Sequence, residues 1–438
     1  MTQQPHDDAS LSGSRSDVGT AGSASHPALA RSLGTFDAVV IGLGSMIGAG
    51  VFAAFAPAAA AAGSALVIGL VLAAVVAYCN ATASAQLAAQ YPTSGGTYVY
   101  GRQRLGDWWG FLAGWGFVVG KTASCAAMAL TFAAYTVPAA WQRPVAALAV
   151  VALTTVNYRG ITRTALVTRV IVAVVLAALG VVVVAGLAAG HPDAGRISLA
   201  PGPHGWYGVL QSAGLLFFAF AGYARIATLG EEVREPARTI PRAISIALGA
   251  TVVVYAVVAA TILSVLGASG VAATPAPLAA AVRAGSWHWA VPVVQVGGAA
   301  AALGALLALV AGVGRTTLAM ARENDLPRWL AGVHPTYKVP HHAEVALAVA
   351  VCALVLTVDL RGAIGFSSFG VLIYYLIANL SAITQDATHR RSPKALQVLG
   401  ILGCAVLVVT LPVTSVVAGV AVYGIGVVYR LVRLRARR

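Results

Sequence analysis

Long uncharged apolar runs are the feature that most restricts how this chain can fold. Residues 170–190 contain no charged or hydroxyl-bearing side chain, and similar runs recur between residues 36 and 430. A helix that crosses the hydrocarbon core of a membrane needs about 20 apolar residues. Only 10% of the residues are charged, whereas soluble proteins carry about 25%. We therefore predict an all-α polytopic membrane protein.

Charged and helix-breaking residues divide the apolar sequence into 12 predicted transmembrane helices. Their expected boundaries are residues 36–62, 64–90, 107–136, 141–157, 164–189, 205–231, 240–268, 289–321, 343–358, 364–385, 395–410 and 412–430. Residues 1–33 lack the apolar centre of a signal peptide and are predicted to be a disordered cytoplasmic tail. Residues 431–438 are predicted to be a basic cytoplasmic tail.

Basic residues fall unevenly on the two sides of the predicted membrane. With alternating helix directions, 23 of the 28 Lys and Arg residues lie on one side and four on the other. The side rich in Lys and Arg is normally cytoplasmic. We therefore expect both termini in the cytoplasm and the chain in the cell membrane, surrounded by lipid. The positive charge is scattered over short loops, so no nucleic-acid partner is predicted.

Glycine-rich stretches interrupt the first and sixth predicted helices. Residues 42–52 (GLGSMIGAGVF) form one stretch, and FFAFAGY (217–223), between Gly214 and Gly230, forms the other. Small residues at this spacing can let two helices pack closely. They can also mark helices that unwind at mid-membrane, where free backbone groups line a transporter's central site. The spacing alone leaves both interpretations open.

Three longer segments resemble the amino acid–polyamine–organocation (APC) superfamily of transporters. They are residues 41–52 (IGLGSMIGAGVF), 217–244 (FFAFAGYARIATLGEEVREPARTIPRAI) and 314–340 (GRTTLAMARENDLPRWLAGVHPTYKVP). The resemblance covers about residues 34–385. It implies a LeuT-like fold, with a five-plus-five inverted repeat in residues 34–190 and 205–385, two C-terminal helices in 395–430, and helices 1 and 6 unwound at mid-membrane. It also implies alternating-access transport of amino acids or related amines.

The resemblance further implies which residues meet the substrate. Backbone N–H groups of the first helix would hold the α-carboxylate, and carbonyls of the first and sixth helices would hold the α-amino group. Aromatic side chains of the sixth helix would form a lid and shape the pocket. The N–H groups belong to Ile47, Gly48, Ala49 and Gly50, the carbonyls to Met46, Phe218, Ala219 and Ala221, and the side chains are Phe218, Phe220 and Tyr223.

Lys121 is the one formally charged side chain expected at membrane depth, near the middle of the third helix. Its insertion costs at least ~2.5–3.5 kcal/mol, so it should face the interior of the bundle, where desolvation disfavours the charged form. Three roles are open. The Lys121 side chain either carries a proton, or supplies a positive charge that favours an anionic substrate, or has a structural role bonded to the backbone.

The residues that the predicted helices lack indicate which ion drives transport and which class of amino acid is carried. Residues 170–190 have no ionisable group and residues 293–313 have no hydroxyl group, whereas a sodium ion needs oxygen ligands. We therefore expect sodium-independent, proton-coupled transport. No carboxylate is expected at depth, which favours neutral amino acids. An amino acid exchanger and a non-transporting amino acid sensor remain as alternatives.

Charged residues after helices 6 and 8 are candidates for an inner gate. Glu231 and Glu232 follow helix 6, and Arg315 and Arg322 lie at the end of helix 8. These residues either form an ion-pair network that closes the cytoplasmic side or serve as interfacial anchors. No catalytic residue, metal ligand or cofactor is predicted, because histidines and carboxylates are peripheral and the four cysteines lie singly in apolar runs. The sequence does not predict the oligomeric state.

Overall fold

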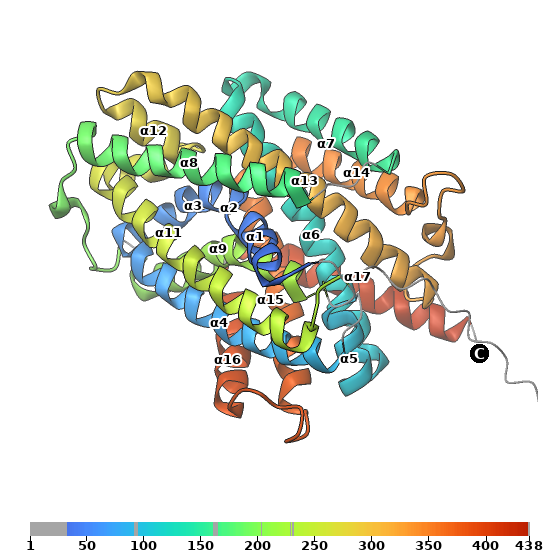
Figure 1. The fold of residues 1–438 in the computed structure, drawn as a ribbon. Helices are drawn as coiled ribbons and strands as arrows, with labels where there is room; N and C mark the ends of the chain where they lie inside the picture. The colour runs from blue at the N-terminus through green and yellow to red at the C-terminus, as the bar shows by residue number, and fades with distance from the viewer. Residues whose placement is uncertain are drawn as a thin grey trace, which may run out of the picture.

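The fold is all-helical, as predicted (Figure 1). The computed structural model describes residues 33–91, 95–160, 165–202, 204–227, 229 and 232–436. Regular structure in these residues is helical, apart from an isolated bridge between Leu33 and Val233. Except for Leu33, the predicted N-terminal tail lies outside the described residues.

Ten helical segments in the described part of the chain are long and apolar enough to cross a membrane. They comprise α1 with α2 (Thr35–Met46, Ala49–Ala53), α3 with α4 (Phe55–Ala62, Leu66–Gln90), α6 (Asp107–Thr136), α7 (Gln142–Tyr158), α8 (Ala165–Ala189), α9 with α10 (Gly205–Phe220, Ala224–Ala227), α11 (Pro236–Ala272), α13 (Val291–Arg322), α15 (Leu360–Ile383) and α17 (Val413–Arg435). Two further apolar helices, α14 (His341–Thr357) and α16 (Lys394–Thr410), have 17 residues each. These segments follow the order of the predicted helices.

Two short helices were not expected from the sequence. The first, α5 (Thr97–Leu105), lies between the second and third predicted helices, and the second, α12 (Pro277–Ala284), lies between the seventh and eighth. Each was missed because it is too short to show a clear apolar period. The last helix, α17, continues to Arg435, so the beginning of the predicted C-terminal tail is helical.

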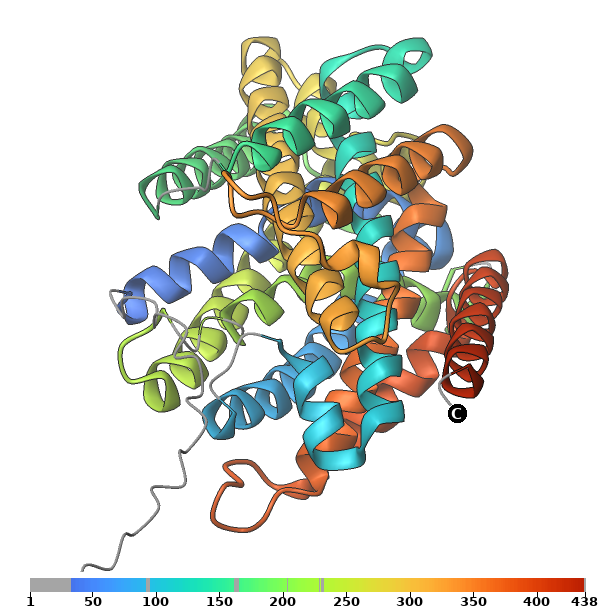
Figure 2. The ribbon, with the colours of Figure 1, turned by 90° about the vertical axis from the view of Figure 1, so that its right-hand side faces the viewer.

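The helix α6 runs through the middle of the bundle and packs along both α13 and α15 (Figures 1 and 2). Its backbone approaches that of α15 very closely. A Cβ atom added to Gly370 would lie 2.7 Å from the Gly116 carbonyl oxygen and 2.9 Å from the Cα of Gly120. Only glycine fits at such a contact, which holds the residues of α6 and α15 side by side.

Contacts between helices show a recurring pattern along the described part of the chain. The helix α4 packs on α9, and α11 packs on α1. The helix α6 packs on α15, and α13 packs on α8. The helices α6 and α7 are neighbours, as are α13 and α14. By contrast, α17 lies at one edge of the bundle (Figure 2).

We expect Gly370→Ala to destabilise the fold, because its new methyl group would overlap the backbone of α6. Overpacking of this kind costs about 1–3 kcal/mol. The midpoint of thermal unfolding in detergent should therefore fall by several degrees. Gly312→Ala in α13 is the matched control, since no atom lies within 4 Å of its added Cβ. Equal midpoints for the two variants would contradict the close packing of α6 on α15.

Candidate functional site

The first helix is interrupted in the predicted stretch. The helix α1 ends at Met46, and α2 begins at Ala49. Between them, Ile47 (φ −79°, ψ 26°) and Gly48 (φ −74°, ψ −147°) leave the helical conformation. The N–H of Ile47 donates to the Leu43 carbonyl at 2.7 Å. This N–H group, which was expected to meet the substrate carboxylate, therefore already has a partner. The first N–H groups of α2 have no acceptor within their own helix.

The sixth helix changes its geometry at the second predicted stretch. The helix α9 ends at Phe220, a 3₁₀ turn, η4, covers Ala221–Tyr223, and α10 begins at Ala224. A mid-helix 3₁₀ turn disrupts the regular backbone hydrogen bonds and is frequent where a helix bends. Carbonyls of this segment are therefore free to accept hydrogen bonds from other helices.

The two interruptions cross in direct backbone contact. A Cβ atom added to Gly222 would lie 2.2 Å from the Ser45 carbonyl oxygen. A Cβ atom added to Gly50 would lie 2.6 Å from the Cα of Ala219. The sequence left close packing and unwinding as alternatives for these glycines. The structure combines close packing with an interruption, because the glycines at the breaks in the two helices also bring the two backbones into contact.

Side-chain donors from three other helices reach the carbonyls at this crossing. The Tyr255 hydroxyl of α11 lies within hydrogen-bond distance of the Met46 carbonyl and 3.1 Å from the Ala219 carbonyl. The Ala221 carbonyl accepts from the Lys121 ammonium of α6 at 3.5 Å and from the Tyr375 hydroxyl of α15 at 3.3 Å. Of the four carbonyls expected to meet a substrate amino group, Ala221 therefore has two donors, and Met46 and Ala219 share the single hydrogen of the Tyr255 hydroxyl.

Tyr255 and Tyr375 were not predicted as site residues. Each is a tyrosine in an apolar helix, and a buried tyrosine hydroxyl needs a hydrogen-bond partner. That requirement is the one signal in the sequence that could have drawn attention to them. It could not have identified the partners, which lie 209 residues away for the Tyr255 contact with Met46 and 154 residues away for the Tyr375 contact with Ala221.

Aromatic side chains close the crossing on both sides. The Phe220 and Tyr255 rings lie 5.1 Å apart, and the Tyr223 and Tyr375 rings lie 4.9 Å apart. Phe220 and Tyr223 are fully buried, and 7% of Phe218 is exposed. Phe220 and Tyr223 thus pack against the two tyrosines whose hydroxyl groups reach the crossing carbonyls.

Lys121 lies in the interior of the bundle, as expected. Its residue exposure is 8%, and its ammonium points to the Ala221 carbonyl. One turn further along α6, the Ser124 hydroxyl lies 2.6 Å from the Ser367 hydroxyl of α15. Within the described residues, no carboxylate lies at ion-pair distance from Lys121. Among the described residues, the hydrogen-bond acceptor of Lys121 is thus a backbone carbonyl of the interrupted sixth helix.

The expected inner gate stays a prediction. Arg315 and Arg322 are exposed, and Glu232 is half-buried. None of the ion pairs in the described ranges joins Glu232 to either arginine. Glu231 lies outside the described residues.

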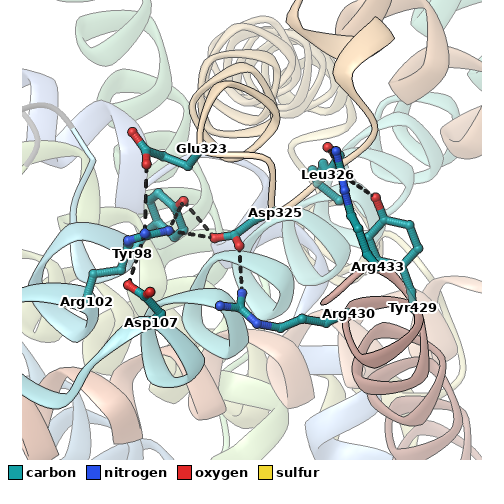
Figure 3. A network of polar contacts seen from close by, with 9 residues as sticks. All are labelled: Tyr98, Arg102, Asp107, Glu323, Asp325, Leu326, Tyr429, Arg430 and Arg433. Atoms are coloured by element: carbon teal, nitrogen blue, oxygen red, sulfur yellow. Dashed lines mark hydrogen bonds and ion pairs between the residues drawn. The ribbon is translucent and has the colours of Figure 1, made fainter. Parts of the chain in front are cut away.

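A buried ionic cluster that sequence analysis missed surrounds Asp325, in the loop after α13 (Figure 3). One carboxylate oxygen of Asp325 accepts from the Tyr98 hydroxyl at 2.8 Å and from the Arg102 guanidinium at 3.0 Å. The other accepts from the Arg430 guanidinium at 2.7 Å. Burial and the neighbouring carboxylate raise the pKa of the Tyr98 hydroxyl above its usual range, so this hydroxyl remains a donor.

The cluster connects α17 to helices that are distant in sequence. The Arg430 guanidinium lies over the rings of Trp108 and Phe111, 4.8 Å and 4.6 Å from their centroids. Arg102 also pairs with Asp107 at the start of α6, at 3.0 Å. The C-terminal helix is therefore bound to α5 and the loop after α13 through the Asp325 carboxylate, and to α6 through the contact of Arg430 with two aromatic rings.

The described residues contain no group of three or more His, Cys, Asp or Glu side chains that could hold a metal ion. The chemistry available at the helix crossing is consequently that of hydrogen-bond donors and acceptors, one ammonium group and aromatic rings. Such a set can bind a small zwitterion.

This chain is similar in sequence to a family of membrane transporters and to several individual proteins. A family model for amino acid permeases matches residues 33–432. The chain is 62% identical over 414 residues to an uncharacterized transporter of Mycobacterium tuberculosis, with 94% of each chain covered. It is 27% identical over 376 residues to cationic amino acid transporter 7 of Arabidopsis thaliana, which covers 80% of this chain and 64% of the relative. It is 25% identical over 411 residues to the branched-chain amino acid permease BcaP of Bacillus subtilis, with 85% and 84% covered.

The buried cluster yields a stability prediction. Asp325→Asn should leave two arginines, Arg102 and Arg430, without their shared buried carboxylate, at a cost of about 3–5 kcal/mol. Asp386→Asn is the matched control, because the Asp386 side chain is 73% exposed and lies 3.9 Å from Arg104; its loss should cost less than about 1 kcal/mol. Thermal unfolding in detergent measures both. Similar small shifts for the two variants would show that the Asp325 cluster adds little to stability.

Proposed function

This chain belongs to the amino acid permease family, and we propose that it is a secondary active transporter that carries amino acids across the cytoplasmic membrane by alternating access. Family and relatives make it a multi-pass membrane transporter and not an enzyme. The observation that carries the proposal is the crossing of two interrupted helices in the interior, with carbonyls that already accept hydrogen bonds from an ammonium and two hydroxyl groups.

The proposed fold has 12 spans in a LeuT-like five-plus-five inverted repeat, followed by two C-terminal helices. The matching helix pairs support it, because the contact of α4 with α9 corresponds to that of α11 with α1 when the halves are exchanged. The two short helices support it as well, since α5 follows the second helix of the first half and α12 follows the second helix of the second half. The distribution of Lys and Arg supports cytoplasmic termini.

We place the α-carboxylate of the substrate at the start of α2. The N–H groups of Gly48, Ala49 and Gly50 are the candidates, and the positive end of the helix dipole favours an anion there. The N–H of Ile47 was also expected to take part, but it would first have to leave the Leu43 carbonyl.

We place the α-amino group at the carbonyls of Met46, Phe218, Ala219 and Ala221. Lys121 and Tyr375 now donate to the Ala221 carbonyl, and the one hydrogen of the Tyr255 hydroxyl lies between the Met46 and Ala219 carbonyls. Substrate binding would then exchange one set of donors for another, so that no buried carbonyl loses its hydrogen bond. Such an exchange keeps the cost of emptying the site low, because an unsatisfied polar group in an apolar interior costs about 1–3 kcal/mol.

Lys121 is the proposed proton-coupling residue. Its ammonium and the substrate ammonium compete for the Ala221 carbonyl, and two cations at one acceptor repel each other. The charge of Lys121 should therefore respond to substrate occupancy. Sodium coupling is disfavoured because residues 293–313 of α13 offer no hydroxyl ligand.

The proposed substrates are neutral amino acids. A cationic side chain would need a carboxylate partner in the pocket, and the ammonium already there is Lys121. The names of the relatives do not decide the matter, since they include a cationic amino acid transporter, a branched-chain amino acid permease and a methylthioribose transporter.

Uptake of radiolabelled amino acids into proteoliposomes tests the proposal, with sodium absent and with or without an inward proton gradient. Accumulation that requires the proton gradient supports proton-coupled transport. Movement that requires amino acid inside the vesicles would instead indicate an exchanger. Binding without movement would indicate a sensor.

Gly48→Leu should abolish uptake without preventing membrane insertion. A Cβ atom at this position would lie 3.1 Å from the Cβ of Ala305, so the larger side chain has to turn into the space needed by a substrate carboxylate. Gly249→Leu is the matched control, because no atom lies within 4 Å of its added Cβ. Retained uptake by Gly48→Leu would exclude the proposed carboxylate site.

Lys121→Met should remove the pH dependence of uptake, because the substituted side chain keeps the aliphatic stem but cannot titrate. Uptake driven only by exchange should persist in part. Lys394→Met, at the exposed start of α16, should keep the pH profile of the unmodified protein. An unchanged profile in Lys121→Met would leave Lys121 with a structural role.

A further inference from the structure

A groove on the side of the bundle lies away from the helix crossing. It runs between α4 and α11 and is bordered by the loop between α15 and α16. Its volume is about 210 Å³, and the residues that line it include Tyr78, Gln86, Ile244, Leu248 and Arg391. Pockets for drug-sized molecules occupy about 300–1,000 Å³, so this groove can hold only part of a larger ligand.

The groove is polar at one end and apolar at the other. Gln86 and Arg391 line the polar end. Tyr78 lies about two turns before Gln86 on α4, and Leu248 lies about two turns after Pro241 on α11, so these two residues line the apolar end. Eight residues of α-helix from Tyr78 to Gln86 correspond to about 12 Å. A ligand with a polar head and an apolar chain matches this gradient.

Gln86 fixes the loop that forms the polar end of the groove. Its side-chain oxygen accepts from the backbone N–H groups of Arg391 and Ser392, both at 3.2 Å. Its side-chain nitrogen is buried, and the residue is only 1% exposed. Gln86 therefore positions Arg391 at the groove and leaves the arginines as the charged donors there.

Two arginines make the polar end positive. Arg391 donates to the Ala237 carbonyl with one nitrogen, and the other N–H groups of its guanidinium remain available. Arg242 lines an adjoining depression, which shares Pro241 and Ser245 with the groove. Neither hollow is lined by an acidic residue. Neither arginine forms an ion pair within the described part of the chain.

We propose that this groove binds one anionic glycerophospholipid. The phosphate lies against Arg391 and Arg242, and the first part of one acyl chain follows Tyr78 and Leu248 towards the middle of the membrane. Basic pockets between transmembrane helices are suited to anionic headgroups. The lipid would bridge α4 and α11, which occupy corresponding places in the two halves.

Native mass spectrometry of the purified full chain tests the proposal, with phosphatidylglycerol or phosphatidylcholine titrated into neutral detergent. Phosphatidylglycerol should bind at about tenfold lower concentration, because the two lipids share the phosphate but the choline cation of phosphatidylcholine is repelled by the two arginines. The double variant Arg242→Gln/Arg391→Gln should lose this preference. Arg159→Gln is the matched control, because Arg159 is exposed and lies at the end of α7, outside the groove.

Two further measurements complete the test. The first separates loss of lipid binding from loss of the fold, and the second separates a membrane lipid from a soluble phosphate compound as the ligand. Ser245→Phe fills the groove from an exposed position without changing charge, and it should abolish the preference for phosphatidylglycerol. Soluble glycerol 1-phosphate should not displace the bound lipid at equal concentration. Unchanged preference in either the double variant or Ser245→Phe, or displacement by glycerol 1-phosphate, would overturn the lipid site.

Discussion

The contact on which the structure depends is the crossing of two interrupted helices backbone to backbone. Because the Gly222 Cα lies against the carbonyl of Ser45, and Gly50 against Ala219, the two segments leave no room for side chains between them. The interior of a membrane protein provides little water, so the polar groups released by each interruption need partners from the protein or from a ligand. Tyr255, Lys121 and Tyr375 are the partners in this state.

The surrounding helices fix those partners in place. Close packing of Gly370 on Gly116 and Gly120 brings α6 and α15 together, which is why Lys121 and Tyr375 can reach the same carbonyl. At one end of α6, the Asp325 cluster holds α17 against the bundle. A site made of backbone atoms requires this rigidity, because its geometry depends on helix positions and not on the rotamer of one side chain.

The sequence predicted the long apolar helices and the positions of the glycine-rich stretches that interrupt two of them. Apolar runs predicted the order of the helices. The glycines near Gly48 and Gly222 marked the places of both interruptions, but their spacing also allowed simple close packing, and the family resemblance was needed to favour an interruption. Short elements such as α5 were missed because nine residues carry too little periodic signal. The partners of Asp325 and Tyr255 were missed for another reason. Asp325 and Arg430 lie 105 residues apart, and nothing in the local sequence indicates which buried charge or hydroxyl meets which acceptor.

Hydrogen–deuterium exchange of the backbone amides, with and without the transported amino acid, tests the central claim most directly. The account predicts that the amino acid slows exchange in the peptides that cover residues 47–52 and 219–224, because those N–H groups and the segments that carry them become ordered around the ligand. Exchange in α16 should not change. Unaltered exchange in both peptides, in a protein that transports the same amino acid, would contradict a substrate site at the helix crossing.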